Sequence, residues 1–289
     1  MYRPSKLILI FLIVIVLFAV QPSFAISGVI FNPYSCLRIG GAWSTTSVNT
    51  CMVSSMIVFR GETVTVTSGI ILDNTGTISN GGVLFNSGGT IYNKGTITNA
   101  GIISNNKDAF ENYGMISNRG TIFNSAPFLN SGTISNSGTL SNDGNITQTH
   151  TGTIINSQGG TITSIHTGII SNLGRISNLG IISNNARLVS NGYILNSAQF
   201  YNWAIIKNNF NFTNNGIITN SGIITNNHGS LMTNSKVIYN SATISNLGLI
   251  SNHGSISNHG TISNYGTIKI CKGIISENPV VGNPPRISC

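Results

Sequence analysis

The chain has 289 residues and a formal charge of +8, yet only 7% of its residues are charged, against roughly 25% in ordinary soluble domains. The basic residues are scattered singly, without basic runs or interleaved aromatics, which argues against a nucleic-acid-binding protein. Abundant Gly and Ser are typical of disordered low-complexity tracts. Here, however, aliphatic residues recur at a fixed spacing and supply a core that such tracts lack.

The N-terminus predicts export. Arg3 and Lys6 form a basic region, residues 7–20 are an unbroken apolar run, and residues 23–25 (SFA) supply small residues for cleavage. This order is typical of a secretory signal peptide, here residues 1–25, and the apolar run is short for a membrane span. After cleavage, 12 basic and 6 acidic side chains are left. We expect a secreted or cell-surface protein; the alternative is membrane anchoring through residues 7–20.

Residues 26–68 lack the repeat that follows. Within them, "SSMIVFRGETVTVTSG" alternates apolar and polar residues, as strands do. We therefore interpret residues 26–68 as an N-terminal cap followed by the first strands.

From residue 69 to residue 270 a six-residue unit, Gly-x-Ile-x-Asn-x, recurs with few breaks. Residues two apart in a strand share a face, so the small first residue and the aliphatic third are expected to point inward. The fifth residue, Asn, is expected at a corner, where it tolerates left-handed backbone angles and where stacked amides bond one another in a ladder. One unit cannot bury its Ile alone. We therefore predict an all-β fold, a single β-solenoid (β-helix).

The number of units in each coil is less directly encoded. The order of the unit resembles the hexapeptide repeat of left-handed β-helices, which places three units in a triangular coil. Three consecutive units, from Gly144, Gly152 and Gly160, have eight residues each, as if one triangular coil were enlarged on every side. Phe200 and Phe212, however, are 12 residues apart and would stack directly in a two-sided coil. The pattern favours coils of three units, and coils of two units remain the alternative.

Four cysteines flank the repeats: Cys36, Cys51, Cys271 and Cys289. An even number of cysteines in an exported chain indicates disulfides. Pairing within each end, Cys36 with Cys51 and Cys271 with Cys289, closes two short loops. We expect residues 271–289, with their three prolines, to form a tail that caps the C-terminal end.

Candidates for chemistry are sparse. Asp108 and Glu111 lie close in sequence but lack the second acidic pair that a carbohydrate-active enzyme would need, so a polar irregular coil is the preferred interpretation. His150 and His166 each precede a Thr in an eight-residue unit and are expected at similar corners, where a metal site is the less favoured alternative. We predict no enzyme activity, no catalytic or metal-binding residue and no cofactor.

Two further features concern the outward positions. Thr-Ile-Ser triplets at 77–79, 133–135, 243–245 and 261–263 would form Thr/Ser rows like those of ice-binding solenoids. Ice binding would require the isoleucines at the second position of the unit to lie on a different side of the coil. These isoleucines are Ile102, Ile169, Ile181, Ile217 and Ile223. The sequons that begin at Asn145 and Asn211 are possible glycosylation sites.

The "GTISNSGTLSNDG" pattern resembles the Asn/Gly-rich β-solenoid repeats of secreted microbial surface proteins, including adhesin-like and hemagglutinin-like ones. The resemblance covers roughly residues 61–270 and implies architecture more than activity. Together with the absence of catalytic groupings, it leads us to expect an exported structural or adhesin-like protein. Expected partners are cell-surface or extracellular polymers, or a second copy through the solenoid ends, and not nucleic acid.

Overall fold

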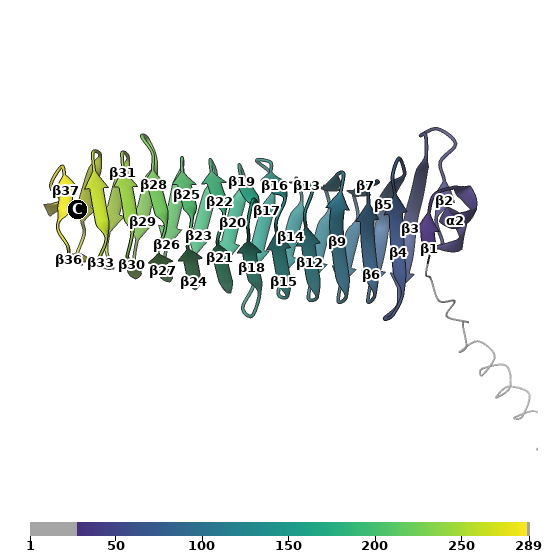
Figure 1. Ribbon diagram of the computed structural model, residues 1–289, viewed down its shortest axis with the longest axis horizontal. Coiled ribbons are helices and arrows are strands. Elements are labelled where there is room, and N and C mark those ends of the chain that lie inside the picture. Colours follow the sequence, from purple (N-terminus) through teal and green to yellow (C-terminus); the bar gives the residue numbers. More distant parts are fainter. Residues whose placement is uncertain (1–27, 288–289) are drawn as a thin grey trace, which may run out of the picture.

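A computed structural model describes residues 28–287, so the predicted signal peptide lies outside the described residues. The described chain winds into one all-β rod of parallel strands stacked along its length (Figure 1). One sheet contains 13 strands, one from each coil, so the rod has about 13 coils. At about 4.8 Å between neighbouring strands, its length is roughly 60 Å. Within these residues no helix is long and apolar enough to cross a membrane.

The strands form three faces, which the chain visits in the order A, B, C. Face A is made by β1 (Gly28–Ile30), β4 (Thr63–Thr67), β6 (Val83–Ser87), β9 (Ile102–Lys107), β12 (Thr121–Asn124), β15 (Thr139–Asn142), β18 (Thr161–Ser164), β21 (Ile181–Asn184), β24 (Gln199–Asn202), β27 (Ile217–Asn220), β30 (Val237–Asn240), β33 (Ser255–Asn258) and β36 (Ile274–Glu277).

Face B is made by β7 (Thr90–Asn93), β10 (Phe110–Asn112), β13 (Pro127–Asn130), β16 (Asn145–Gln148), β19 (Ile169–Asn172), β22 (Arg187–Ser190), β25 (Ile205–Asn208), β28 (Ile223–Asn226), β31 (Thr243–Asn246), β34 (Thr261–Asn264) and β37 (Val280–Gly282). Face C is made by β8 (Thr96–Asn99), β11 (Met115–Asn118), β14 (Thr133–Asn136), β17 (Thr153–Asn156), β20 (Arg175–Asn178), β23 (Tyr193–Asn196), β26 (Asn211–Asn214), β29 (Leu231–Asn234), β32 (Leu249–Asn252), β35 (Thr267–Ile270) and β38 (Arg286–Ile287). The long strands β3 (Thr50–Val58) and β5 (Ile71–Asn80) each run from face B into face C, which joins these faces into one 25-stranded sheet.

Every strand of the repeat region pairs in parallel with the third strand after it, so each coil has three sides. For example, β12 pairs with β15, and β15 pairs with β18. The prediction of three-sided coils is confirmed, and the two-sided alternative is wrong. The three eight-residue units form β16, β17 and β18, one on each face, so a single coil is enlarged on every side.

Phe200 and Phe212 do not stack as a two-sided coil would require. Phe200 lies on face A, in register with Ile218, and Phe212 lies on face C, in register with Met232. Their rings are tilted by 51° with centroids 5.6 Å apart, so the two side chains meet across the interior. Phe110 and Phe128 are in register on face B and stack with centroids 4.7 Å apart.

The third position of each unit builds the core, as predicted. Ile134, for example, is fully buried and lies in register with Ile116 and Ile154 of the adjoining coils. The first position is different, because its glycine faces the preceding coil rather than the interior. A Cβ on Gly132 would lie 2.0 Å from the Gly114 carbonyl oxygen. Glycine is therefore needed for the close approach of successive coils, and the prediction that this residue points inward is wrong.

The fifth-position asparagines point inward, and none of them lies in the left-handed region among the described residues. The Asn therefore lies beside the corner, as predicted, but without a left-handed backbone conformation, and the predicted ladder is present. On face C an unbroken ladder runs from Asn80 to Asn252, in which each side-chain amide donates to the amide oxygen of the next coil. Many amides also donate to backbone carbonyls; Asn118 donates to the Thr139 oxygen at 3.0 Å. The ladder thus satisfies polar groups at the buried corners.

Two serines interrupt the ladders on the other faces. Ser164 replaces Asn on face A, and its hydroxyl donates to the Gly168 carbonyl within its own coil. Asn184, in the next coil of face A, consequently has a buried amide oxygen without a hydrogen-bond partner. Ser190 ends a ladder on face B in the same way, by donating to the Gly192 carbonyl.

The two ends of the rod differ. The short helix α2 (Pro33–Arg38) and strand β2 (Ala42–Trp43) lie at the N-terminal end (Figure 1). Asn32 and Ser35 form a capping box at the start of α2. At the other end, β36, β37 and β38 pair in parallel with the preceding coil. The described part of the tail therefore adds a further coil to the rod.

Candidate functional site

Separate hollows lie at corners of the solenoid. At each corner the sixth-position residue projects outward, and the first-position residue that follows is usually Gly or Ala. The second-position residue then points outward from the next face. Where such a hollow forms, small residues make its floor and longer side chains make its walls. We call the corner between faces B and C the BC edge, and the corner between faces A and B the AB edge.

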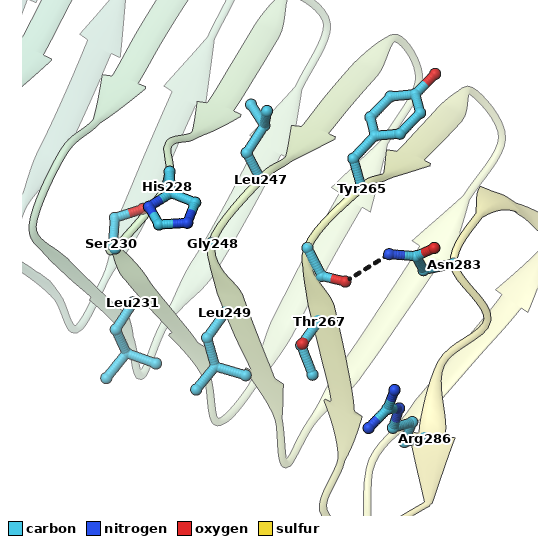
Figure 2. Close-up of a pocket in the computed structure, with 12 residues that line it drawn as sticks. His228, Ser230, Leu231, Leu247, Gly248, Leu249, Tyr265, Thr267, Asn283 and Arg286 are labelled. Carbon is cyan, nitrogen blue, oxygen red and sulfur yellow. Dashed lines mark hydrogen bonds between the residues drawn. The ribbon is translucent and has the colours of Figure 1, made fainter.

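One hollow lies on the BC edge near the C-terminal end, and we call it the BC groove (Figure 2). It has a volume of about 600 Å³. One wall is the corner row of His228, Leu247 and Tyr265, and the other is the outward row of Leu231, Leu249 and Thr267, which are in register on face C. The floor is Ser230, Gly248 and Gly266.

The BC groove presents apolar and aromatic surface to solvent. Tyr265 is 69% exposed and Leu247 is 42% exposed. The floor cannot be filled, because a Cβ on Gly248 would lie 2.4 Å from two backbone oxygens of the preceding coil. Asn283 donates to the Gly266 carbonyl at 3.1 Å at the C-terminal end of the groove, where Arg286 also lines it.

A second hollow, with a volume of about 340 Å³, lies on the BC edge nearer the N-terminus. Its lining is Tyr92, Lys94, Glu111 and Tyr113, and we call these four residues the tyrosine cluster. Tyr92 and Glu111 are in register on face B, while Lys94 and Tyr113 follow face B at the corner. The Lys94 ammonium lies 2.7 Å from the Asp73 carboxylate and 5.7 Å from the centre of the Tyr92 ring.

Hydrogen bonding orients Tyr113. Its hydroxyl donates to the Glu111 carboxylate. This hydrogen bond, followed by burial and the negative charge of Glu111, raises the pKa of Tyr113 to about 12. The ring is 48% exposed, so the cluster offers an accessible aromatic ring whose hydroxyl is held by a neighbouring carboxylate.

The acidic pair from the sequence is divided between two parts of the coil. Asp108 is exposed in the turn between β9 and β10 at the AB edge, where its φ is 55°. Glu111 points outward from β10 and accepts the hydrogen bond from Tyr113. The structure thus places Glu111 with tyrosines and a lysine, while Asp108 occupies a strained turn.

The predicted similarity of the two histidine corners is wrong. His150 follows β16 at the BC edge, whereas His166 follows β18 at the AB edge. His166 Nδ1 lies 3.5 Å from the Asp143 carboxylate. Among residues 28–287, no group of three or more His, Cys, Asp or Glu side chains is placed to hold a metal ion.

The Thr/Ser triplets are split between faces B and C. Residues 77–79 and 133–135 lie on face C, whereas 243–245 and 261–263 lie on face B. The N-terminal half of face C contains a column of Thr77, Thr96, Met115, Thr133 and Thr153 in register. The five outward isoleucines named above all lie on faces A and B.

The two sequons begin strands and point outward. Asn145 is exposed at the start of β16, and Asn211 is half-buried at the start of β26, where it accepts a hydrogen bond from Thr213 at 3.2 Å.

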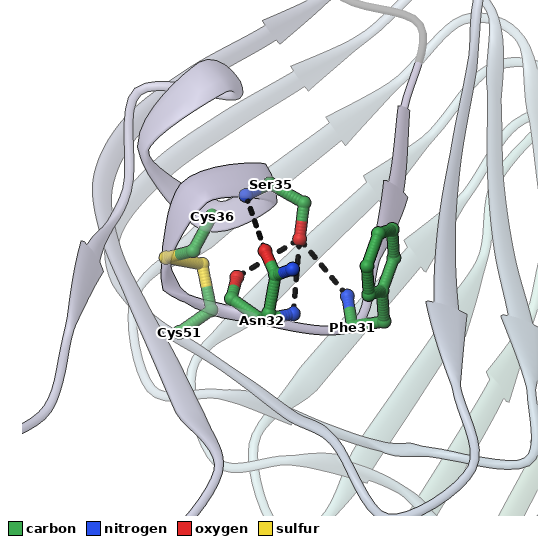
Figure 3. Close-up of a disulfide and its surroundings, with 5 residues drawn as sticks. All are labelled: Phe31, Asn32, Ser35, Cys36 and Cys51. Atoms are coloured by element: carbon green, nitrogen blue, oxygen red, sulfur yellow. Dashed lines mark hydrogen bonds between the residues drawn. A yellow bond between two sulfur atoms is a disulfide. The ribbon is translucent and has the colours of Figure 1, made fainter.

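Cys36 and Cys51 form the expected disulfide, which joins α2 to β3 (Figure 3). Its Cα–Cα distance is 5.6 Å, and both cysteines are fully buried. Ser35, beside Cys36, accepts hydrogen bonds from the Phe31 and Asn32 amides. The bridge therefore ties the cap helix to the first long strand. Cys289 lies outside the described residues, so its pairing with Cys271 stays a prediction.

The BC edge was missed by sequence reasoning, because its residues become neighbours only when the length of every coil is known. Comparison with protein-family models, with curated proteins and with solved structures gave no match. The function must therefore be argued from the rod itself.

Proposed function

We propose that this protein is an exported, non-enzymatic β-solenoid, structural or adhesin-like, that contacts polymers of a cell surface or extracellular matrix. The observation that carries the proposal is the BC groove. It runs along the rod axis across successive coils, with Leu247 and Tyr265 on one wall and Leu231 and Leu249 on the other. An extended polymer chain laid along it would contact side chains of successive coils, and several weak contacts along one chain add up to strong attachment.

The surroundings of the groove support this choice of partner. No carboxylate lines it, and its exposed large hydrophobic side chains are Leu247 and Tyr265, beside exposed His228 and Arg286. The resemblance to repeats of microbial surface proteins is in keeping with such a role. The alternative partner is a second copy of the chain, bound through the solenoid ends. In that case the average molecular mass measured by light scattering should rise with protein concentration.

The test is co-sedimentation of the purified protein with insoluble cell-envelope and matrix fractions. Leu247→Ser combined with Tyr265→Ser should weaken binding roughly tenfold, because two exposed apolar contacts are removed. The control is Tyr239→Ser on face A, where the tyrosine is 47% exposed and lies outside the groove; it should bind normally. Equal binding by the double variant and the wild type would contradict a role for the BC groove.

A second candidate function is ice or mineral binding by the threonine column of face C. The observation that favours it is the column itself, in which four threonines, Thr77, Thr96, Thr133 and Thr153, lie in register with Met115 among them. Thermal hysteresis that is lost in Thr96→Leu combined with Thr133→Leu would favour this candidate. Absence of thermal hysteresis in the wild-type protein would rule out ice binding.

A further inference from the structure

We propose that the tyrosine cluster binds a neutral saccharide unit of a glycan. This inference rests on the proposed function and names the chemistry of one polymer that the rod would contact. The site is distinct from the BC groove, because its walls are the corner row and face B rather than the corner row and face C.

The cluster combines the two surfaces that a sugar ring requires. A pyranose has an apolar C–H face and a rim of hydroxyl groups. Tyr92 and Tyr113 supply aromatic rings for the C–H face. Glu111 accepts hydrogen bonds from hydroxyls, and the ammonium of Lys94 has three N–H donors, of which Asp73 takes one.

Internal contacts hold these groups in place before a ligand arrives. Tyr113 is oriented by its bond to Glu111, and Lys94 is held by Asp73 and the Tyr92 ring. Asp73 is itself confined, since its side chain is only 14% exposed and its Oδ1 is buried without a hydrogen-bond partner. Such preorganisation reduces the entropy that binding must overcome.

Charge argues against an anionic ligand. An anion would meet the carboxylates of Glu111 and Asp73, of which only Asp73 is paired with a cation, Lys94. A single metal ion is disfavoured too, because Tyr92 separates Asp73 from Glu111 in register, which places them two strand spacings apart, or roughly 10 Å. A neutral polyhydroxylated ring can donate hydroxyl hydrogens to the Glu111 carboxylate and accept hydrogen bonds from the Lys94 ammonium.

The experiment is ligand-observed NMR and calorimetry of the purified protein with neutral β-gluco-, α-gluco-, manno- and galacto-oligosaccharides. Tyr92→Ala and Tyr113→Ala should each weaken binding about tenfold, and Tyr113→Phe should weaken it less because the ring is kept. The control is Tyr201→Ala, since Tyr201 also donates to a side chain two residues earlier, Gln199, but lies on face A. It should bind as the wild type does.

Several outcomes would overturn the inference: no neutral oligosaccharide binds, only acidic ones bind, or binding persists in the Tyr92 and Tyr113 variants. The groove variant Leu247→Ser/Tyr265→Ser separates the two proposals, because it should keep saccharide binding at the tyrosine cluster. Matrix binding without oligosaccharide binding would reject the saccharide site and leave the proposed function standing. Saccharide binding without matrix binding would reject the proposed function and leave the saccharide site standing.

Discussion

Replacing Asn196 with alanine tests whether the buried ladder holds the coils together. The Asn196 side chain accepts a hydrogen bond from Asn178 at 2.8 Å and donates to Asn214 at 2.8 Å. It also donates to the carbonyls of Ala198 and Ile217, at 3.1 and 3.2 Å. Its neighbours keep other partners: Asn178 still donates to Gln199, and the Ala198 carbonyl still accepts from the Ile217 amide. The loss is therefore about three net hydrogen bonds and a small cavity, or about 3–4 kcal/mol.

The matched control is Asn191→Ala in the same coil. Asn191 is exposed and also takes part in an amide–amide bond, accepting from Asn209 at 2.6 Å, but water replaces that bond when it is lost. We expect a change within about 0.5 kcal/mol. Asn196→Ser should fall between the two, since Ser190 keeps a bond to its own turn. Denaturant unfolding followed by circular dichroism measures all three variants. Equal stability of Asn196→Ala and Asn191→Ala would refute a stabilising ladder.

Three further predictions concern single positions. Ile182→Asp, which buries a charge in the core, should lower the free energy of unfolding by at least about 4 kcal/mol. Ser183→Asp, on the outer surface, should lower it by less than about 1 kcal/mol. Similar losses in the two variants would show that the inward and outward assignment of these residues is wrong. Ser164→Asn should stabilise the rod by about 1 kcal/mol by donating to the Asn184 amide oxygen, and a lower melting temperature would contradict this. The pKa of Tyr113 is raised from 10.0 to about 12, so its contribution to stability is full below pH 10.0 and is lost as the pH rises through about 12. Phenolate absorbance should show that Tyr113 ionises at a high pH in the wild type and at a lower pH in Glu111→Gln. An unchanged titration of Tyr113 in Glu111→Gln would reject Glu111 as the cause of the raised pKa.

The core and the shape of the coil were predictable because each depends on spacing alone. An Ile every six residues must lie on one side of a strand, and Ile134 and Ile182 are buried as expected. The three consecutive eight-residue units indicated three sides, since an insertion at every corner of one coil leaves the register of the next coil intact.

The direction of the Gly and the backbone conformation of the Asn were predicted wrongly for a physical reason. Strand alternation alone would put the first, third and fifth residues of a unit on the same side. The chain turns a corner after the fifth residue, however, and this corner rotates the first residue of the following unit away from the interior. The Asn therefore stays inside, as Asn136 does, while the glycine faces the coil before it, as Gly132 does. Spacing alone does not encode where the corner begins.

The candidate sites depend on the summed length of each coil and so could not be read from local motifs. Tyr92 and Tyr113 are 21 residues apart, and they share a hollow because Tyr92 is in register with Glu111. Leu247 and Tyr265 are 18 residues apart and line one wall of the BC groove. Irregular insertions, such as the turn at His228 and Gly229, change these offsets from coil to coil.

The most direct test of the central claim is fractionation of the native cells with imaging of the labelled protein. An exported contact scaffold predicts recovery with the cell surface or extracellular matrix and label on the outside of intact cells. Recovery only from the cytosol, or only as a freely soluble monomer that binds no cell or matrix fraction, would contradict it.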